Sequence, residues 1–510
     1  MKKIIIAISL LLVIILPIIY ITSNSEVTVR DASKDFKENV SLCYEVFPIA
    51  YRDGNNDGIG DIKGITDSLD YLKDDLQVDC IWITPIHPSK SYHKYDVINY
   101  REIDQAFGTL DDYKELIKEA HDRDIRILMD FVINHTSTDH EWFKGWKAKD
   151  EKYLDYYSWV SKEDYEALKN KSGWHKYDDR YYFGSFWDQM PELNFENEKV
   201  RDEIYDIAKY WLKLGVDGFR IDAAKHVYDK REHPELDTLQ KNIDFFIEFN
   251  DVVKRKNKNA FIIGEIWTSV DVSKRYLEGM DSVFNFDFGE DLVDALNQMN
   301  TTQLNKNVTK VYDSFYSIKE DAIISNFVTN HDQNRALNQL YNSKEKMIQA
   351  AANYLMQPGI SWIYYGEEIG MTGVKPDERI REPFKWVEEG QPNSKWTPTI
   401  ANKSTSLEEQ RNDEDSYFEI YKQLVDIRQN SDVIKTGDIK VVEFGKKIFA
   451  FKRTLGEEEI FVISNFSDEA FPIKTDLSAY EVMFSNNNVT IEVGKLTLPG
   501  NTTIIVGSKH

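Results

Sequence analysis

Residues 218–226 read GFRIDAAKH, a short apolar run that ends in an acidic residue and is followed by a Lys-His pair. Three other runs are built in the same way: ILMDFVINH at 127–135, FIIGEIW at 261–267 and FVTNHD at 327–332. Short apolar runs of this kind predict strands of a buried parallel sheet. Because each run ends in polar side chains, we expect the four strands to bring reactive groups to one edge of that sheet.

The full chain contains eight such strand-like runs. They cover residues 43–50, 79–86, 125–133, 216–222, 260–267, 281–287, 323–330 and 359–365. Segments with helical periodicity lie between them, such as 110–122, where Thr109 and Asp112 form a capping box. Eight strands that alternate with helices predict an α/β fold, a closed (β/α)8 TIM barrel, which we assign to residues 40–135 and 191–432.

The alternation of strands and helices is interrupted twice. Residues 136–190 follow the third strand, are rich in Trp, Tyr, Asp and Lys, and show no clear period, which indicates an inserted subdomain. From about residue 435 onward the helical pattern disappears, and short β-rich segments follow at 438–444, 447–454, 458–465 and 494–506. Residues 433–510 are therefore predicted to form a C-terminal antiparallel β-domain of the sandwich type.

The composition excludes some classes of function. The 510 residues include 63 basic and 87 acidic side chains, which gives a net charge of −24. Proteins that bind nucleic acid neutralise phosphates with Lys and Arg, so we expect no nucleic-acid partner. Hydrophobic residues make up 41% and charged residues 29%, which is typical of a globular protein.

The N-terminus has the composition of an export segment. Met1, Lys2 and Lys3 precede an apolar stretch from Ile4 to Ile21. Residues 1–25 are therefore predicted to be a secretory signal peptide or, because the stretch is long enough to cross a bilayer, an uncleaved membrane anchor. We expect the protein to be extracellular, or held on the outer face of the cell membrane by that anchor, and to act as a monomer.

The chain has two cysteines, Cys43 and Cys80, each at the start of a predicted strand. Their even number and the exported context permit one disulfide bond. The alternative, which we favour from the sequence, is a pair of buried thiols that pack as small hydrophobic groups.

The acidic ends of the predicted strands suit the hydrolysis of a glycosidic bond. That reaction uses one carboxyl group to protonate the leaving oxygen and a second to attack or stabilise the cationic sugar carbon. The candidates are Asp222, Glu265 and Asp332. Arg220 lies two residues before Asp222, so both side chains share a face of the strand, where the guanidinium is expected to hold Asp222 ionised.

The four runs together resemble, in the same order, the signature regions of glycoside hydrolase family 13, the α-amylase family. The resemblance implies that Asp222 is the nucleophile, Glu265 the general acid/base and Asp332 a stabiliser of the transition state. It also implies the fold deduced above, with a retaining mechanism. The residues that it places around the substrate are Tyr95, Asp96, His135, Arg220, Lys225, His226 and His331.

Two short segments refine the resemblance. Residues 93–96 read HKYD, where the family usually has His-Gly-Tyr-Asp. Residues 190–194 read MPELN, which is similar to a motif of the group between oligo-1,6-glucosidases and neopullulanases. That group usually has Asp at the position of Glu192.

A loop after the first strand has the composition of a calcium site. Residues 53–61 read DGNNDGIGD, and hard oxygen ligands at alternate positions suit Ca²⁺. The expected ligands are Asp53, Asn55, Asp57, Asp61 and the carbonyl of Ile59. A similar loop binds calcium in several members of the resembled family. An ordinary turn built from Asp, Asn and Gly is the alternative reading.

The resemblance and the export segment favour an endo-acting α-1,4-glucan hydrolase that digests starch, glycogen and maltooligosaccharides outside the cell. The first alternative is an α-glucosidase, oligo-1,6-glucosidase or neopullulanase-like enzyme, which the segment REPFKW at 381–386 partly echoes. The second is a non-catalytic, membrane-anchored binding subunit with a glycosidase-like ectodomain. The three acids argue against this second alternative, because a binding protein is free to lose them.

Overall fold

The computed structural model describes residue 36 and residues 39–509. The predicted signal peptide or anchor at 1–25 lies outside the described residues. In the part of the chain that is described, we find no helix with both the length and the apolar character needed to span a bilayer.

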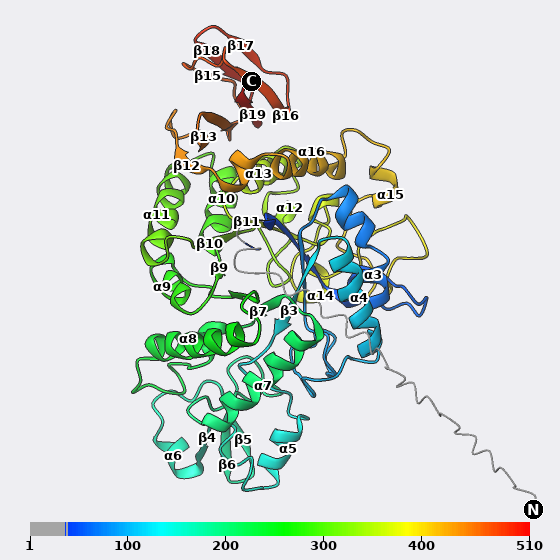
Figure 1. The fold of residues 1–510 in the computed structure, drawn as a ribbon, viewed down its shortest axis with the longest axis vertical. Coiled ribbons are helices and arrows are strands. Elements are labelled where there is room, and N and C mark those ends of the chain that lie inside the picture. Colours follow the sequence, from blue (N-terminus) through cyan, green and yellow to red (C-terminus); the bar gives the residue numbers. More distant parts are fainter. Residues whose placement is uncertain (1–35, 37–38, 510) are drawn as a thin grey trace, which may run out of the picture.

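The centre of the molecule is a closed barrel of eight parallel strands, in the order β1-β11-β10-β9-β8-β7-β3-β2 (Figure 1). The strands are β1 (Leu42–Val46), β2 (Cys80–Ile83), β3 (Arg126–Phe131), β7 (Gly218–Ile221), β8 (Phe261–Gly264), β9 (Ser282–Phe284), β10 (Ile323–Asn326) and β11 (Ile360–Tyr364). Each lies within or overlaps one of the eight predicted runs and is shorter than it. The predicted TIM barrel is confirmed.

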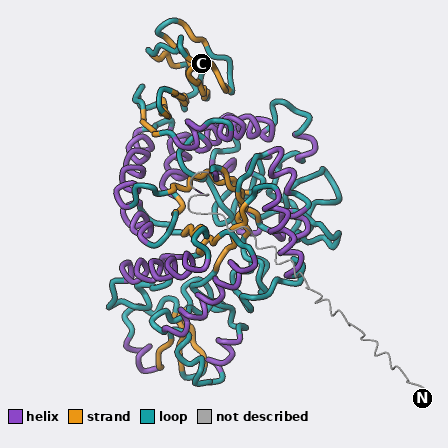
Figure 2. The backbone as a smooth tube through the Cα atoms, viewed as in Figure 1, coloured by secondary structure: helices purple, strands orange, loops and turns teal. Residues whose placement is uncertain are grey.

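Helices surround the strands (Figure 2). The long ones are α4 (Leu110–Asp122), α7 (Glu198–Leu214), α8 (Thr238–Lys256), α10 (Phe286–Gln298), α11 (Thr302–Ile318), α13 (Lys344–Leu355) and α16 (Tyr417–Gln429). The predicted capping box of Thr109 and Asp112 begins α4. Helix α7 ends at Gly215, whose φ of 106° is a left-handed conformation that glycine adopts without steric cost.

Shorter helices lie mostly in the connections between these elements. They are α2 (Pro48–Tyr51), α3 (Ile62–Thr66), α9 (Val270–Ser273), α12 (Ala336–Gln339), α14 (Asp377–Ile380), α15 (Leu407–Gln410) and α17 (Asp432–Thr436). Single turns of other helix types are η1 (Tyr71–Asp75), η2 (Ala224–His226), η3 (Lys274–Glu278) and η4 (Glu367–Ile369).

The segment after β3 forms a small sheet of its own, in the order β4-β6-β5. Its elements are α5 (Glu141–Lys147), β4 (Trp159–Ser161), α6 (Lys162–Ala167), β5 (Trp174–Tyr177) and β6 (Arg180–Phe183). The guanidinium of Arg180 lies 4.0 Å from the ring centre of the buried Trp146, at the core of this unit. Aromatic and cationic groups replace an aliphatic core here, which is why the sequence shows no regular apolar period.

The C-terminal residues form two antiparallel sheets beyond α13 and α16 (Figure 1). One contains β12 (Asp438–Val441), β13 (Ile448–Leu455), β14 (Glu458–Asn465), β19 (Thr502–Ser508) and β16 (Tyr480–Ser485), and the other β15 (Phe471–Ile473), β18 (Lys495–Leu498) and β17 (Thr490–Glu492). The predicted β-rich segment at 494–506 contains β18 and most of β19. A turn at residues 499–501 divides it between the two sheets.

The two cysteines form a disulfide between neighbouring barrel strands. Cys43 on β1 and Cys80 on β2 are register partners, and their Cα atoms are 4.6 Å apart. The preferred expectation of two separate thiols is therefore wrong. It failed because the sequence does not show that the two strands pair with the cysteines directly opposite one another.

Candidate active site

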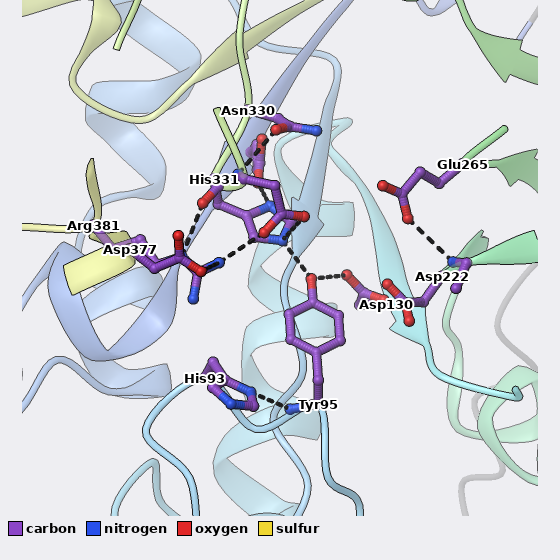
Figure 3. A network of polar contacts seen from close by, with 12 residues as sticks. His93, Tyr95, Asp130, Asp222, Glu265, Asn330, His331, Asp377 and Arg381 are labelled. Carbon is purple, nitrogen blue, oxygen red and sulfur yellow. Dashed lines mark hydrogen bonds and ion pairs between the residues drawn. The ribbon is translucent and has the colours of Figure 1, made fainter. Parts of the chain in front are cut away.

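The acidic ends of four barrel strands meet at one mouth (Figure 3). Asp130 lies on β3, Asp222 follows β7 directly, and Glu265 follows β8 directly. Asp332 lies in the loop after β10. Because all strands of a parallel barrel point the same way, their carboxyl ends share one face, and groups far apart in the chain are brought together there.

Arg220 connects three of these acids. Its Nη1 lies 2.9 Å from Asp130 Oδ2 and 2.8 Å from Asp222 Oδ1, and its Nη2 lies 2.8 Å from Glu265 Oε2. The predicted contact between Arg220 and Asp222 is confirmed. Since Asp222 and Glu265 bind the two terminal nitrogens of one planar guanidinium, both carboxylates flank the same small space.

The site has a buried layer and an accessible layer. The side chains of Arg220, Asp130 and His331 have an exposed fraction of 0%. The side chains of Asp222 and Glu265 are 11% and 13% exposed, and that of Asp332 is 33% exposed. The three predicted catalytic acids are thus the ones that a substrate can reach, whereas the buried groups hold them from behind.

A second cluster holds Asp332. Its Oδ1 accepts from Arg381 Nη2 at 2.7 Å, and its Oδ2 lies 3.2 Å from His331 Nε2. His331 Nδ1 lies 2.5 Å from Glu45 Oε1, and Tyr95 Oη lies 2.7 Å from His331 Nε2. The hydroxyl of Tyr95 also donates to Asp130 at 3.1 Å, which connects this cluster with the one around Arg220 (Figure 3).

Burial and neighbouring charges shift the acidity of these groups in opposite directions. Burial raises the pKa of Asp222 well above its ordinary range, and Glu265 and Asp130 add to this shift while Arg220 opposes it. The expectation that Arg220 by itself holds Asp222 ionised is therefore wrong, because burial favours the protonated carboxyl group and the one positive charge is shared among three carboxylates.

His331 and Asp332 are both held in their charged forms. Burial alone would lower the pKa of His331, but Asp332 and Glu45 raise it to about 10. Burial likewise opposes ionisation of Asp332, but His331 and Arg381 hold its pKa far below the ordinary value. Asp332 therefore faces the mouth as a fixed negative charge.

Two left-handed residues shape the loops of the site. Ala223 has a φ of 47°, and this turn directs its amide N–H to Glu265 Oε2 at 3.1 Å. Lys94 in the HKYD segment has a φ of 66°, where the usual glycine of the resembled family is free of steric cost. The Nζ of Lys94 lies 2.7 Å from Asp104 Oδ2 in a largely buried ion pair, which offsets part of that cost.

The other predicted substrate residues are placed less uniformly. His135 is buried, its Nε2 has no hydrogen-bond partner, and burial lowers its pKa to about 4, so it is neutral and has a free ring nitrogen. Asp96 accepts from Ser89 and Ser91 and from the backbone of Lys90, so it holds its own loop.

The Lys-His pair lies at the edge of the mouth. Lys225 Nζ donates to the carbonyl of Trp267 at 2.7 Å. His226 Nδ1 lies 2.7 Å from Asp229 Oδ2, and its ring lies edge-on to Phe186 with centroids 5.2 Å apart.

Several functional residues were missed from the sequence. The sequence pattern places Asp130 at the end of a strand without indicating a role. It does not indicate that Glu45 and Arg381 belong to the site. Arg381 is the first residue of the REPFKW segment, whose sequence is partly similar to a segment of oligo-glucosidases. Only the pattern of Glu45 on the first strand, polar within an otherwise apolar run, could have indicated that it faces inward.

The predicted calcium loop is internally hydrogen-bonded. Asp53 accepts from the amides of Asn56 and Gly58 at 2.7 and 2.8 Å, and Asp57 accepts from the amide of Ile59 at 2.8 Å. Asp61 caps α3 by accepting from Gly64 at 2.6 Å. Across the described residues, no group of three His, Cys, Asp or Glu side chains is placed to hold a metal ion.

Comparison with known families identifies the family to which this chain belongs. Residues 45–437 match the model of the alpha-amylase catalytic domain, and residues 448–505 match that of the C-terminal domain of the alpha-amylase SusG. The chain belongs to glycoside hydrolase family 13, the α-amylase family. The predicted resemblance is confirmed, and this family member is an enzyme of the α-amylase type.

Individual relatives of this glycoside hydrolase carry different activities. Alpha-amylase 3 of Dictyoglomus thermophilum is 35% identical, with 91% of this chain and 93% of the relative covered. An oligo-1,6-glucosidase of Bacillus cereus is 31% identical, with 89% and 96% covered. The crystal structure of an alpha-amylase from H. orenii superposes with a TM-score of 0.85 at 35% identity, covering 92% of this chain and all of that one.

The MPELN motif of this family member contains a buried acid. Glu192 is 1% exposed and accepts from the amide of Ser185 at 2.7 Å. Burial and the nearby carboxylate of Glu232 raise the pKa of Glu192 to about 8, and burial also raises that of Glu232. The glutamate that replaces the usual aspartate is thus held uncharged below that pH.

We predict that Glu192→Gln stabilises the protein at alkaline pH. The pKa of Glu192 is higher in the folded chain than its ordinary value of 4.5, so the folded state binds more protons between that value and about 8, and its stability falls as pH rises through this interval. The variant avoids this loss and keeps an acceptor for Ser185. Its Tm should exceed that of the unmodified protein at pH 8.5 and approach it at pH 4.5.

The matched control is Glu196→Gln, a nearby acid whose Oε1 lies 2.8 Å from Lys241 Nζ at the surface. It should give no such gain at pH 8.5. If the difference in Tm between Glu192→Gln and the unmodified chain stays the same from pH 4.5 to pH 8.5, the buried-acid interpretation is contradicted.

Proposed function

We propose that this enzyme is a retaining, endo-acting hydrolase of α-1,4-glucosidic bonds in starch, glycogen and maltooligosaccharides. The observation that carries the proposal is the attachment of Asp222 and Glu265 to the two terminal nitrogens of Arg220, at 2.8 Å each. Retaining glycosidases need two carboxyl groups about 5–5.5 Å apart, whereas inverting enzymes leave room for a water molecule between them. Two carboxylates bound to one guanidinium support the shorter separation.

The chemistry follows from the positions of the three acids. Glu265 donates its proton to the glycosidic oxygen as the bond to the sugar carbon breaks, and Asp222 attacks that carbon from the opposite side. Asp332, held ionised by His331 and Arg381, places a fixed negative charge near the positive charge that develops. Water then attacks the glycosyl-enzyme, gives its proton to Glu265 and releases Asp222.

An array of exposed aromatic side chains supports a polymeric substrate. Phe186, Trp187 and Trp267 are 50%, 45% and 40% exposed. Phe186 packs against His135 and His226, and the ring of Trp187 lies 6.5 Å from that of His93. Aromatic faces suit the apolar faces of successive sugar rings, so these exposed side chains offer stacking positions near the acids.

A second candidate activity is that of an oligo-1,6-glucosidase. The relative from Bacillus cereus carries that name, and Arg381 of the REPFKW segment contacts Asp332 in the site. Comparing hydrolysis of soluble starch with that of isomaltose separates the two activities. Preferential release of glucose from isomaltose would favour the second candidate.

We predict that Asp222→Asn lowers kcat/KM on starch by roughly 10⁴-fold or more, because the amide is a poor nucleophile. Its Tm should stay close to that of the unmodified enzyme, since the amide still accepts from Arg220. Glu265→Gln provides the contrast: it should fail on starch but retain far more activity on maltosyl fluoride, whose leaving group needs no proton. Near-normal starch hydrolysis by Asp222→Asn would show that another residue is the nucleophile.

We predict that Trp187→Ala lowers kcat/KM on starch by about three- to tenfold, the loss expected for one stacked ring, with little change on maltotriose. Tyr316→Ala is the matched control, because Tyr316 is 44% exposed on α11, outside the group of residues that line the mouth. Equal losses on the long and short substrates would remove the argument for an extended aromatic platform.

We also propose that the loop at 53–61 binds one Ca²⁺. Carbonyl and carboxylate oxygens of Asp53, Asn55, Asp57 and Ile59 lie within one short turn, and Asn55 and Asp57 are exposed. Hydrogen bonds from Asn56, Gly58 and Gln391 outweigh burial and lower the pKa of Asp53, so it carries a negative charge. Asp61 contributes by capping α3, which fixes the end of the loop. The ion would hold this loop and has no step in the reaction.

We predict that a chelator lowers the Tm by several degrees and that added Ca²⁺ restores it, because a ligand bound only by the folded state stabilises that state. Asp57→Asn should abolish this sensitivity, whereas Asp67→Asn, at the C-terminal end of α3, should leave it intact. An unchanged Tm after chelation, with the protein shown to be free of metal, would argue for an ordinary turn.

We propose further that the enzyme is exported and acts outside the cell as a monomer. The basic and apolar N-terminal segment supports export, and the disulfide between Cys43 and Cys80 is typical of oxidising compartments. Determining the first residue of the exported protein distinguishes a cleaved signal from a retained anchor.

A further inference from the structure

We propose that Glu45 on β1 is a positioning residue that orients His331 and, through it, the chain of polar contacts that ends at the nucleophile. The chain runs through Tyr95, Asp130 and Arg220 to Asp222, and each step is a contact of 3.1 Å or less. Glu45 is 2% exposed and lies behind the site, so it does not reach the substrate. Its role would be indirect.

The donor and acceptor of each hydrogen bond in this series of polar contacts follow from the types of group involved. His331 places Nδ1 against Glu45 at 2.5 Å and Nε2 against Asp332 at 3.2 Å. The carboxylate of Glu45 accepts from Nδ1–H, and because the single hydroxyl hydrogen of Tyr95 goes to Asp130, Nε2 must also carry a proton. Nε2–H then donates to Tyr95 Oη, and the Tyr95 hydroxyl is left to donate to Asp130.

The direction of hydrogen-bond donation between His331 and Tyr95 reverses if His331 loses one proton. With a neutral ring protonated only on Nδ1, Nε2 becomes an acceptor and draws the hydroxyl hydrogen of Tyr95 away from Asp130. Asp130 then competes more strongly for Arg220, and Asp332 loses its imidazolium partner. Both the nucleophile and the stabilising carboxylate are affected by one proton that Glu45 helps to retain.

Charged and titratable groups face His331 from every element around it. They are Glu45 on β1, Asp130 on β3, Tyr95 in the loop after β2, Asp332 in its own loop, and Arg381 after α14, whose Nε donates to the His331 carbonyl at 2.8 Å. The rings of Phe47 and Trp82 pack on the imidazole and exclude water. Glu45 and Asp332 are the two carboxylates in contact with the ring, so the removal of either changes its protonation.

The test compares pH profiles of Glu45→Gln, Glu45→Asp and Tyr44→Phe. With Glu45→Gln, His331 keeps a hydrogen-bond partner but loses one of two negative neighbours, so kcat/KM should fall at alkaline pH by about tenfold per pH unit above the lowered pKa of His331. Glu45→Asp should restore the alkaline limb while turnover stays reduced. Tyr44 precedes Glu45 on β1, and Tyr44→Phe removes its hydrogen bond to Glu368 of η4, which should leave the pH profile of kcat/KM unchanged.

A second measurement is independent of catalysis and of folding of the variants. In the unmodified protein labelled with ¹⁵N-histidine, both ring nitrogens of His331 should remain protonated at pH 8. The pH profiles of kcat/KM depend on the proposed hydrolysis, whereas this spectrum does not. If the proposed function is wrong, the unmodified protein shows no hydrolysis while the spectrum still reports the protonation of His331. A neutral His331 at pH 8, or a Glu45→Gln profile parallel to that of Tyr44→Phe, would overturn the proposal.

Discussion

The buried cation of Arg220 is the group on which the architecture of the site depends. Its side chain has no exposed surface, yet it compensates the charge of acids on β3, after β7 and after β8. Charges removed from water without partners are very costly, and truncating one member of a buried pair leaves the others uncompensated. The neighbouring strands must therefore keep the register that places Asp130 beside Arg220, which the pairing of β3 with β7 provides.

The same physical constraint explains why the site has two layers. Groups that are wholly buried, such as Asp130 and His331, are connected through the hydroxyl of Tyr95 and have no exposed surface. The acids at the surface of the cluster are held by these groups but keep accessible oxygens. A glycosidase needs this division, because the reacting carboxyls must approach the sugar closely while their orientation and charge are set by neighbours that do not move.

Strain is concentrated where the chain must turn sharply near the reacting groups. Ala223 adopts a left-handed conformation directly after Asp222, and Lys94 does so beside Tyr95. Each such residue costs about 1–3 kcal/mol and persists only where surrounding contacts impose it. At Ala223 the result is an amide aimed at Glu265, and at Lys94 the long side chain gains a largely buried partner in Asp104.

The amino-acid sequence by itself indicated the eight strands, the helices between them and the three acids for which we propose catalytic roles. These features are local: apolar runs set the strands, and an acid at the end of a run is visible without knowledge of the fold. Tertiary structure alone decided that Glu45 meets His331 across 286 positions, that Cys43 bonds Cys80, and that Arg220 divides its charge among three acids. Those relations depend on which strands become neighbours and in which register, and no local pattern of residues encodes the distance between two side chains that the closed barrel brings into contact.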